Sequence, residues 1–339
     1  MIRQGMLGRL GFIAVVASIG ALLVATAAQA STITVGSVLP PGSTPTEFKT
    51  VETLFNTALP EKGANLTSPV SGAIVRWRMQ DPAGGPFSLR VLRPNGSGGY
   101  MAAGTSNPVT PSIGGGLQTF TANLPVQAGD LIGVDPTNPT DKIGVAPEVA
   151  GASYGFIFPP PFDGATVAPS GSEAGKEIEL SAEVQPTPVI TSVAPDFGPV
   201  AGGTTVTITG TDLASASAVK FGTVPATSFK AESETKITAV VPSSAKVVGV
   251  DVTATTIAGT SATTKDDRFF YEGCVVPKLK GKTLKSAKRV LGRADCKVGK
   301  VTSRPGKPGK VLKQGTKPGK VLASHSKVNL TVGKKPAAK

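Results

Sequence analysis

Residues 198–210 have the sequence GPVAGGTTVTITG, and no other stretch indicates so clearly how this chain folds. Gly202 and Gly203 have the backbone freedom that a tight turn requires. Directly after them polar and apolar residues alternate, which is the pattern of a half-buried β-strand. Because successive side chains of a strand point to opposite faces, Val206 and Ile208 are expected to face a core and the neighbouring threonines to face solvent.

The composition extends this prediction to nearly the whole chain. The 339 residues include 41 Gly and 29 Pro, together with many Thr and Val. β-Branched residues suit strands, and Gly and Pro end strands in turns, so this mixture favours short strands joined by tight loops. We expect a mainly β protein of two or three domains, with one clear helix near the C-terminus.

Three further motifs flank the opening stretch, and together the four resemble a known domain. They are residues 190–195 (ITSVAP), 198–210, 219–222 (VKFG) and 269–271 (FFY). The segment 188–272 is similar to an IPT/TIG domain, which is an immunoglobulin-like β-sandwich. The resemblance implies a stiff spacer or interaction module, because such domains share no catalytic residues.

The segment 274–333 resembles a second family, the PASTA domain. This domain occurs in the extracellular part of bacterial serine/threonine kinases and in some penicillin-binding proteins. The matching positions are Val276, Pro277, Gly281, residues 284–291, residues 309–311 (GKV), Gln314, Gly319 and residues 326–332 (SKVNLTV). The resemblance implies a small α+β domain with one helix on a three-stranded sheet. It also implies binding to peptidoglycan fragments.

The helix expected at 284–291 has recognisable ends and one apolar face. Thr283 is the expected N-cap, and Gly292 is the expected C-terminal stop. The apolar residues that share one helical face are Leu284, Ala287, Val290 and Leu291. We expect this face to pack against the sheet.

Cys274 and Cys296 are the only two cysteines of the chain. In an exported protein such a pair usually forms a disulfide, which here would join the start of the C-terminal domain to the strand after its helix. A metal site is the alternative, but it needs more ligands than two thiols and His325 provide. We therefore predict a disulfide, no metal and no cofactor.

Residues 31–186 form a third segment with its own strand pattern. Apolar and polar residues alternate at 33–35, 74–79, 87–91, 117–120 and 178–184, and a turn sequence lies at 94–96. Period-two alternation indicates antiparallel strands with one buried face. A β-sandwich of the jelly-roll type is the simplest architecture, and it offers a surface for a protein or glycan partner.

Two groups of side chains in this segment are candidates for carbohydrate chemistry. Trp77 and Tyr100 are candidates for a sugar-stacking platform, although Trp77 fits a core position at least as well. Glu177, Glu179 and Glu183 are expected on the solvent face of an alternating strand, which we favour over a pair of glycosidase carboxylates.

Other catalytic or metal-binding arrangements have little support in the sequence. His325 is the only histidine, and we expect it to be a solvated loop residue rather than the base of a triad. Asp130, Asp135 and Asp141 lie near turns and offer oxygen ligands for calcium, but their spacing fits no known calcium loop. We expect no catalytic residue and no enzyme activity.

The N-terminal segment 1–30 predicts export. Two arginines precede an apolar stretch at 11–28, and Ala-Gln-Ala follows at 28–30. This is the layout of a secretory signal peptide with cleavage before Ser31, and an uncleaved membrane anchor is the alternative. No later apolar run is comparable in length, so we expect no transmembrane segment after cleavage.

Charge is concentrated in the C-terminal part of the chain. Residues 31–273 hold 14 Lys and Arg against 21 Asp and Glu, whereas residues 274–339 hold 19 against 1. A basic surface of this density attracts polyanions. The lysines expected to bind are Lys278, Lys280, Lys282, Lys307, Lys310, Lys317 and Lys320. Residues 334–339 are expected to be a disordered basic tail that adds to the attraction.

These observations predict a secreted or wall-associated, non-enzymatic bacterial surface protein. Its basic PASTA domain would bind cell-wall peptidoglycan or an anionic wall polymer, since export makes intracellular nucleic acid an unsuitable partner. The β-sandwich modules would be displayed outward. The alternatives are a structural surface or matrix component without a specific ligand, and an extracellular carbohydrate-active enzyme in the N-terminal sandwich.

Overall fold

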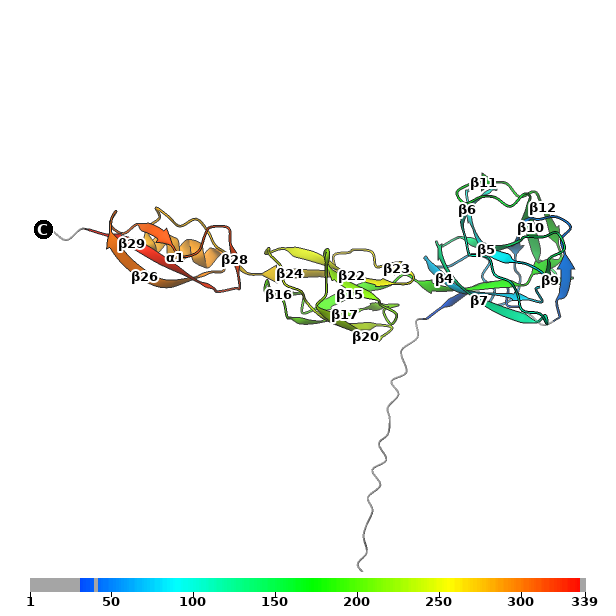
Figure 1. Ribbon diagram of the computed structural model, residues 1–339, viewed down its shortest axis with the longest axis horizontal. Helices are drawn as coiled ribbons and strands as arrows, with labels where there is room; N and C mark the ends of the chain where they lie inside the picture. The colour runs from blue at the N-terminus through cyan, green and yellow to red at the C-terminus, as the bar shows by residue number, and fades with distance from the viewer. Residues whose placement is uncertain (1–30, 40–41, 336–339) are drawn as a thin grey trace, which may run out of the picture.

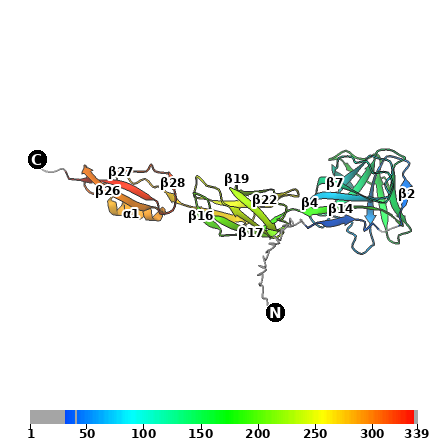
Figure 2. The ribbon, with the colours of Figure 1, turned by 60° about the horizontal axis from the view of Figure 1, so that its bottom comes forward.

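The computed structural model describes residues 31–39 and 42–335. Three modules follow one another along the molecule, with the N-terminal module at one end and the C-terminal module at the other (Figures 1 and 2). The predicted signal peptide, 1–30, and residues 336–339 of the predicted basic tail lie outside the described residues. Within the described ranges, no helix is both long and apolar enough to cross a membrane.

The N-terminal module consists of short strands. They are β1 (Ile33–Gly36), β2 (Thr44–Glu47), β3 (Thr53–Ala58), β4 (Gly72–Gln80), β5 (Phe87–Pro94), β6 (Tyr100–Thr105), β7 (Leu117–Val126), β8 (Leu131–Pro136), β9 (Lys142–Pro147), β10 (Ser153–Ile157), β11 (Thr166–Val167), β12 (Gly171–Ala174), β13 (Lys176–Ile178) and β14 (Leu180–Pro186). The strands predicted from alternation are all present, except that the one predicted at 178–184 is divided between β13 and β14.

The strand order of this module is that of a jelly roll. One sheet has the order β1-β14-β4-β7, and the main part of the facing sheet has the order β6-β5-β8-β3. If these eight strands are numbered along the chain, the two orders become 1-8-3-6 and 5-4-7-2, which is the pattern of two interlocked Greek keys. The predicted jelly-roll sandwich is therefore confirmed. A third sheet, β13-β9-β2, covers one end of the module.

Trp77 lies at the centre of the core between these sheets. Its side chain is 0% exposed and packs on Phe120, with 4.8 Å between the ring centroids. Tyr100 belongs to the other sheet, where it packs edge-on against Phe55 with the centroids 4.9 Å apart. The sugar-stacking interpretation of Trp77 and Tyr100 is wrong, because one ring is fully buried and the two rings lie on different sheets.

The three aspartates that could offer oxygen ligands to calcium instead form hydrogen bonds or ion pairs within the protein. Asp130 accepts two hydrogen bonds of 2.8 Å from Arg93, and Asp135 is paired with Arg90. Asp141 accepts backbone hydrogen bonds from two turns. Across the described residues, no group of three or more His, Cys, Asp or Glu side chains is arranged to hold a metal ion.

The prediction that Glu177, Glu179 and Glu183 face solvent is wrong. Glu177 and Glu179 are both 0% exposed, and Glu183 is 7% exposed. Glu183 is neutralised by Arg76 and Arg78 on the neighbouring strand β4. A strand alternates between two faces, but here the second face is also covered by parts of the chain that are distant in sequence.

Glu177 and Glu179 differ from Glu183 because no basic group neutralises them. Their four carboxylate oxygens are buried and have no hydrogen-bond partner among the described residues. Burial, and for Glu177 also the adjacent carboxyl of Glu61, raises the pKa of each to about 7. Both carboxyls are therefore largely neutral in acidic solution, and ionising them costs folding free energy.

We predict that the N-terminal module loses stability as the pH rises because of these two carboxyls. Their contribution to the free energy of unfolding is complete below about pH 4.5, which is the pKa of these carboxyls in the unfolded chain. It declines as the pH rises from there to about 7, which is their pKa in the folded protein. The double variant Glu177→Gln/Glu179→Gln should remove this decline. The wild-type protein should lose on the order of 3 kcal/mol per carboxyl across that range.

The measurement is urea unfolding at a series of pH values, followed by tryptophan fluorescence. Trp77 is the only tryptophan of the chain, and it reports on this module. The exposed Glu47→Gln is the control for the loss of a negative charge. An equally steep decline in wild type and double variant would contradict the assignment.

The second module is a two-sheet sandwich. Its strands are β15 (Val189–Ala194), β16 (Phe197–Pro199), β17 (Thr205–Thr211), β18 (Ala218–Phe221), β19 (Val224–Pro225), β20 (Ser228–Ser233), β21 (Lys236–Val240), β22 (Gly249–Thr256), β23 (Gly259–Thr260) and β24 (Arg268–Glu272). The sheets have the orders β15-β17-β21-β20 and β16-β24-β22-β18-β19. Val206 and Ile208 on β17 are 0% exposed, so the alternation predicted for this strand is confirmed.

The turn before β17 depends on glycine. Gly202 has φ +74°, and a Cβ at this position would lie 2.6 Å from the carbonyl carbon of Pro242. The same Pro242 carbonyl oxygen accepts a 2.9 Å hydrogen bond from the buried Tyr271 hydroxyl. The turn and the last strand of the module are thus fixed to one loop.

The third module places one helix on a small sheet. Its elements are β25 (Cys274–Val275), α1 (Leu284–Arg293), β26 (Lys297–Pro305), β27 (Val311–Gln314), β28 (Val321–Leu322) and β29 (Lys327–Lys334). The main sheet has the order β26-β29-β27, and β25 pairs with β28. The predicted three-stranded sheet is confirmed.

The helix begins where predicted and ends two residues later than predicted. Thr283 is the N-cap, and its side chain accepts a hydrogen bond from the Ser286 amide at 3.2 Å. Gly292 is not the stop, because the helix continues to Arg293 and Ala294 is the C-cap. The left-handed residue that follows is Asp295, with φ +54°. Aspartate tolerates this conformation better than most residues, so glycine is not required.

Short connections join the modules. Between the first and second, the Thr187 amide and hydroxyl both donate to the carbonyl of Ser71. Between the second and third, Gly273 is the one residue between β24 and β25, and a Cβ there would lie 2.7 Å from the Leu322 carbonyl oxygen. Val321 of the third module packs against the core of the second. The junctions leave little free chain between neighbouring modules.

Candidate functional site

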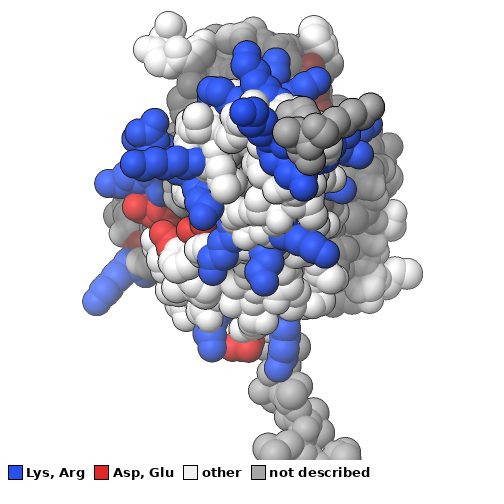
Figure 3. Space-filling view, turned by 90° about the vertical axis from the view of Figure 1, so that its left-hand side faces the viewer, with Lys and Arg blue, Asp and Glu red and all other residues white. Residues whose placement is uncertain are grey.

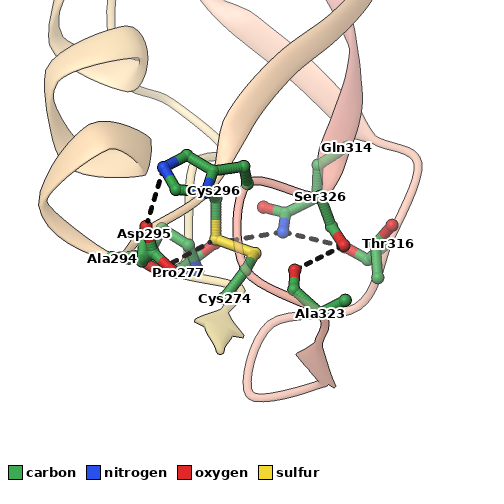
Figure 4. The surroundings of a disulfide bond; sticks show 10 residues. Cys274, Pro277, Ala294, Asp295, Cys296, Gln314, Thr316, Ala323 and Ser326 are labelled. Atoms are coloured by element: carbon green, nitrogen blue, oxygen red, sulfur yellow. Dashed lines mark hydrogen bonds and ion pairs between the residues drawn. A yellow bond between two sulfur atoms is a disulfide. The ribbon is translucent and has the colours of Figure 1, made fainter. Parts of the chain in front are cut away.

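The site is built on a covalent bridge at the start of the C-terminal module. Cys274 and Cys296 form a disulfide with 4.8 Å between their Cα atoms, so the predicted pairing is confirmed (Figure 4). The bridge joins β25 to the chain between α1 and β26. Both cysteines are part of the small core that lies between the helix and the sheet.

Gln314, at the end of β27, holds two lysine-bearing loops together. Its amide nitrogen donates to the carbonyls of Pro277 and Thr316, at 3.1 and 2.9 Å (Figure 4). Its amide oxygen accepts from the Leu279 amide at 2.8 Å. The loop 276–283 is therefore fixed beside the loop 315–320. A backbone bridge between Thr283 and Lys310 adds the loop 306–310 to the same group.

The seven lysines predicted to bind a polyanion all lie on these three loops. Lys282 and Lys310 are half-buried, and the other five are exposed. The structure therefore joins segments that are up to about forty residues apart in sequence, through the Gln314 side chain and through backbone hydrogen bonds such as that from the Val276 amide to the Lys320 carbonyl. This arrangement brings the loops together, and it leaves the lysine side chains available to a ligand.

The positive charge of this module is not neutralised within the molecule. In the described part of the chain, no Lys or Arg from residue 274 onward forms an ion pair. The one acidic residue, Asp295, lies 3.4 Å from His325 Nε2. Figure 3 looks at this end of the molecule and shows Lys and Arg over much of its surface, with Asp and Glu confined to a few spots.

A second basic surface, which the sequence analysis did not identify, lies on the open face of the sheet. A hollow of about 280 Å³ is lined by Lys300, Thr302, Lys313, Gly315, Asn329, Leu330 and Thr331. The period-two alternation of Lys300 with Thr302 and of Asn329 with Thr331 could have placed each pair on one face. The parallel pairing of β26 with β29, which brings the two pairs together, could not be derived from alternation.

His325 lies in a different hollow, between the second and third modules. This hollow has a volume of about 610 Å³ and is lined by Pro199, Val247, Glu272, Gly273, Asp295, Ser324 and His325. A Ser-His-Asp triad requires a hydroxyl bonded to the imidazole. Among the described side chains none is, and the nearby Ser326 hydroxyl donates to the Ala323 carbonyl instead. His325 is exposed, as the sequence predicted.

Comparison with known families identifies two of the three modules. Residues 188–271 match the IPT/TIG domain model, and residues 275–334 match the PASTA domain model. The chain therefore carries an IPT/TIG domain followed by a PASTA domain, which confirms both resemblances. Domains of these two kinds in one chain fit a multidomain cell-surface protein, and PASTA domains are generally associated with peptidoglycan binding.

Comparison with whole proteins adds little. No curated protein matches the chain. One similar solved structure is the full extracellular region of Plexin A4, domains 1 to 8, at 18% sequence identity and a TM-score of 0.25. The match covers 65% of this chain and 18% of that one, so the chain spans less than a fifth of the Plexin A4 region.

We predict that the disulfide stabilises the PASTA domain by about 3 kcal/mol, since the bridge closes a loop between cysteines 22 residues apart. The double variant Cys274→Ser/Cys296→Ser should lose this amount. Hydrogen exchange measured on peptides from residues 275–334 should show a correspondingly lower free energy of opening. Peptides from β17 are the internal control and should be unchanged. Equal protection in variant and wild type would show that the core alone holds the domain.

Proposed function

We propose that this is a secreted, non-enzymatic cell-surface protein that its basic PASTA domain holds to the cell wall, through peptidoglycan or an anionic wall polymer. The observation that carries the proposal is the charge of this domain. Residues 274–339 hold 19 Lys and Arg against one acidic residue, and none of the described Lys and Arg among them forms an ion pair. The family match supports a wall ligand.

Electrostatics explains why a polyanion is the suitable partner. Unpaired lysines on a surface produce a positive potential that attracts a chain of negative charges, and binding releases the small ions that accompany both. An uncharged wall fragment would not be attracted by this positive potential. The repeated charges of a wall polymer would engage the three lysine-bearing loops together.

The other two modules fit a display role. The IPT/TIG domain, with short junctions on both sides, separates the PASTA domain from the jelly roll. The jelly roll would then face away from the wall and bind a protein or a glycan. Its tryptophan and the carboxyls of Glu177 and Glu179 are fully buried, so they do not support a glycosidase site on the surface of this module.

We predict that the full-length secreted chain binds purified cell walls and that binding weakens as salt is added, because screening reduces the attraction. Reversing four exposed loop lysines, Lys278, Lys280, Lys317 and Lys320, to Glu should reduce the bound amount at least about tenfold. The measurement is a pull-down on walls with and without their anionic polymers.

The matched control reverses four exposed lysines of the other modules, Lys49, Lys62, Lys220 and Lys230, which changes the net charge equally. This control should bind nearly as well as wild type. Binding that persists on bare peptidoglycan and ignores salt would favour a neutral pocket in the PASTA domain. No binding to either kind of wall would refute the anchoring proposal.

A further inference from the structure

The open face of the PASTA sheet has a row of hydrogen-bond donors. Thr302 on β26 and Thr331 on β29 lie opposite each other, and their hydroxyl oxygens are 3.1 Å apart. Lys313 on β27 is the partner of Thr331 on the other side. Three adjacent strands therefore contribute one lysine and two hydroxyls to the same strip.

Asn329 forms the second row, two residues before Thr331 on β29. Its side-chain oxygen accepts a 2.8 Å hydrogen bond from the Lys300 amide, which fixes the orientation of the side chain. The Asn329 Nδ2 group is then free to donate, and no partner for it is present among the described residues. The Lys300 side chain begins at the same point and supplies the second ammonium group.

Glycines on both sides keep this hollow open. A Cβ at Gly299 would collide with the Asn329 side-chain oxygen, and a Cβ at Gly315 would lie 3.2 Å from the Asn329 Cβ. Neither neighbouring strand therefore places a side chain over Asn329. A depression remains where an alternating sheet would otherwise present a continuous layer of side chains.

The chemistry of the hollow selects an anion. Its polar side chains are two ammonium groups, two hydroxyls and one amide whose acceptor is already used, and none of its lining residues is acidic. No arginine lines it, so it lacks the planar fork that pairs with a carboxylate or a phosphate through two parallel hydrogen bonds. Lysine is a common phosphate ligand that acts as a point charge, and the hydroxyls and the amide offer further donors to the unesterified oxygens of a phosphodiester.

We propose that this hollow binds a phosphate group of a phosphodiester-linked polymer, with Lys300 and Lys313 on either side, and with Asn329 and one hydroxyl of the hydrogen-bonded Thr302–Thr331 pair donating to the phosphate oxygens. The inference rests on the proposed wall-binding function and specifies its ligand. A volume of about 280 Å³ accommodates one repeat unit and is below the range of most drug-sized pockets. The loop lysines then contribute general attraction, and the sheet face recognises the phosphate.

The test uses the full-length secreted chain and poly(glycerol phosphate) as the probe, with poly-glutamate as a carboxylate polymer of equal charge. The site variant is Lys300→Gln/Lys313→Gln, and the matched control, with the same loss of charge in the same domain, is Lys285→Gln/Lys288→Gln at two exposed lysines of the helix. The Kd for poly(glycerol phosphate) should rise about tenfold in the site variant and no more than about threefold in the control. Both variants should weaken poly-glutamate binding equally.

A second variant separates recognition from charge. Thr302→Val/Thr331→Val leaves the net charge unchanged and replaces each hydroxyl by a methyl group of similar size. It should raise the Kd for poly(glycerol phosphate) roughly fivefold and leave poly-glutamate binding unchanged. Circular dichroism and thermal unfolding of each variant check that the domain remains folded.

Two results would overturn the inference. One is equal weakening of phosphate-polymer binding by the site variant and its control, which would make the interaction one of total charge only. The other is absence of binding to poly(glycerol phosphate) by the wild-type chain. In either case wall binding in the pull-down would leave the anchoring function intact, whereas loss of wall binding itself would remove the proposed function as well.

Discussion

The disulfide between Cys274 and Cys296 is the contact on which the rest of the C-terminal module depends. The module has a small core, and its many positive charges repel one another with only Asp295 to offset them. Cys274 also follows Gly273, the one residue that separates the PASTA domain from the last strand of the IPT/TIG domain. The bridge therefore opposes internal repulsion, and it joins the strand at the junction covalently to the chain after the helix, in addition to the short β25–β28 pair.

Separation of charge along the molecule gives the intermediate module a physical role. The segment before the PASTA domain has more acidic than basic residues, so an anionic surface repels it while attracting the C-terminal end. Attraction between exposed charges within one molecule fades beyond a Debye length of about 8 Å at physiological salt. The eight-residue strand β22 alone extends roughly 26 Å at the usual rise per residue. A spacer of this length prevents the acidic module from neutralising the basic one.

Local periodicity predicted those features that depend on one strand or one helix. Val206 and Ile208 are buried where alternation placed them, and Thr283 caps the helix that its position indicated. The same rule gave the wrong answer for Glu177 and Glu179, because alternation separates two faces without indicating whether the second is covered. Here Ser37 and Ser43, about 140 residues earlier, lie close enough to these carboxyls to influence their pKa. Only the tertiary structure contains that information.

The two basic surfaces of the PASTA domain also differ in whether the sequence alone could predict them. Composition alone located the charge, but the hollow on the sheet requires the parallel register of β26 with β29 and two glycines on either side of Asn329, which no local pattern specifies. One consequence concerns affinity. The family model matches one PASTA domain, at residues 275–334. On the proposed function, a polymer with many identical phosphates would add avidity, because a domain that releases one repeat unit finds the next at a high effective concentration. Retention at the wall would then depend on the repeats of the ligand rather than on repeats of the domain.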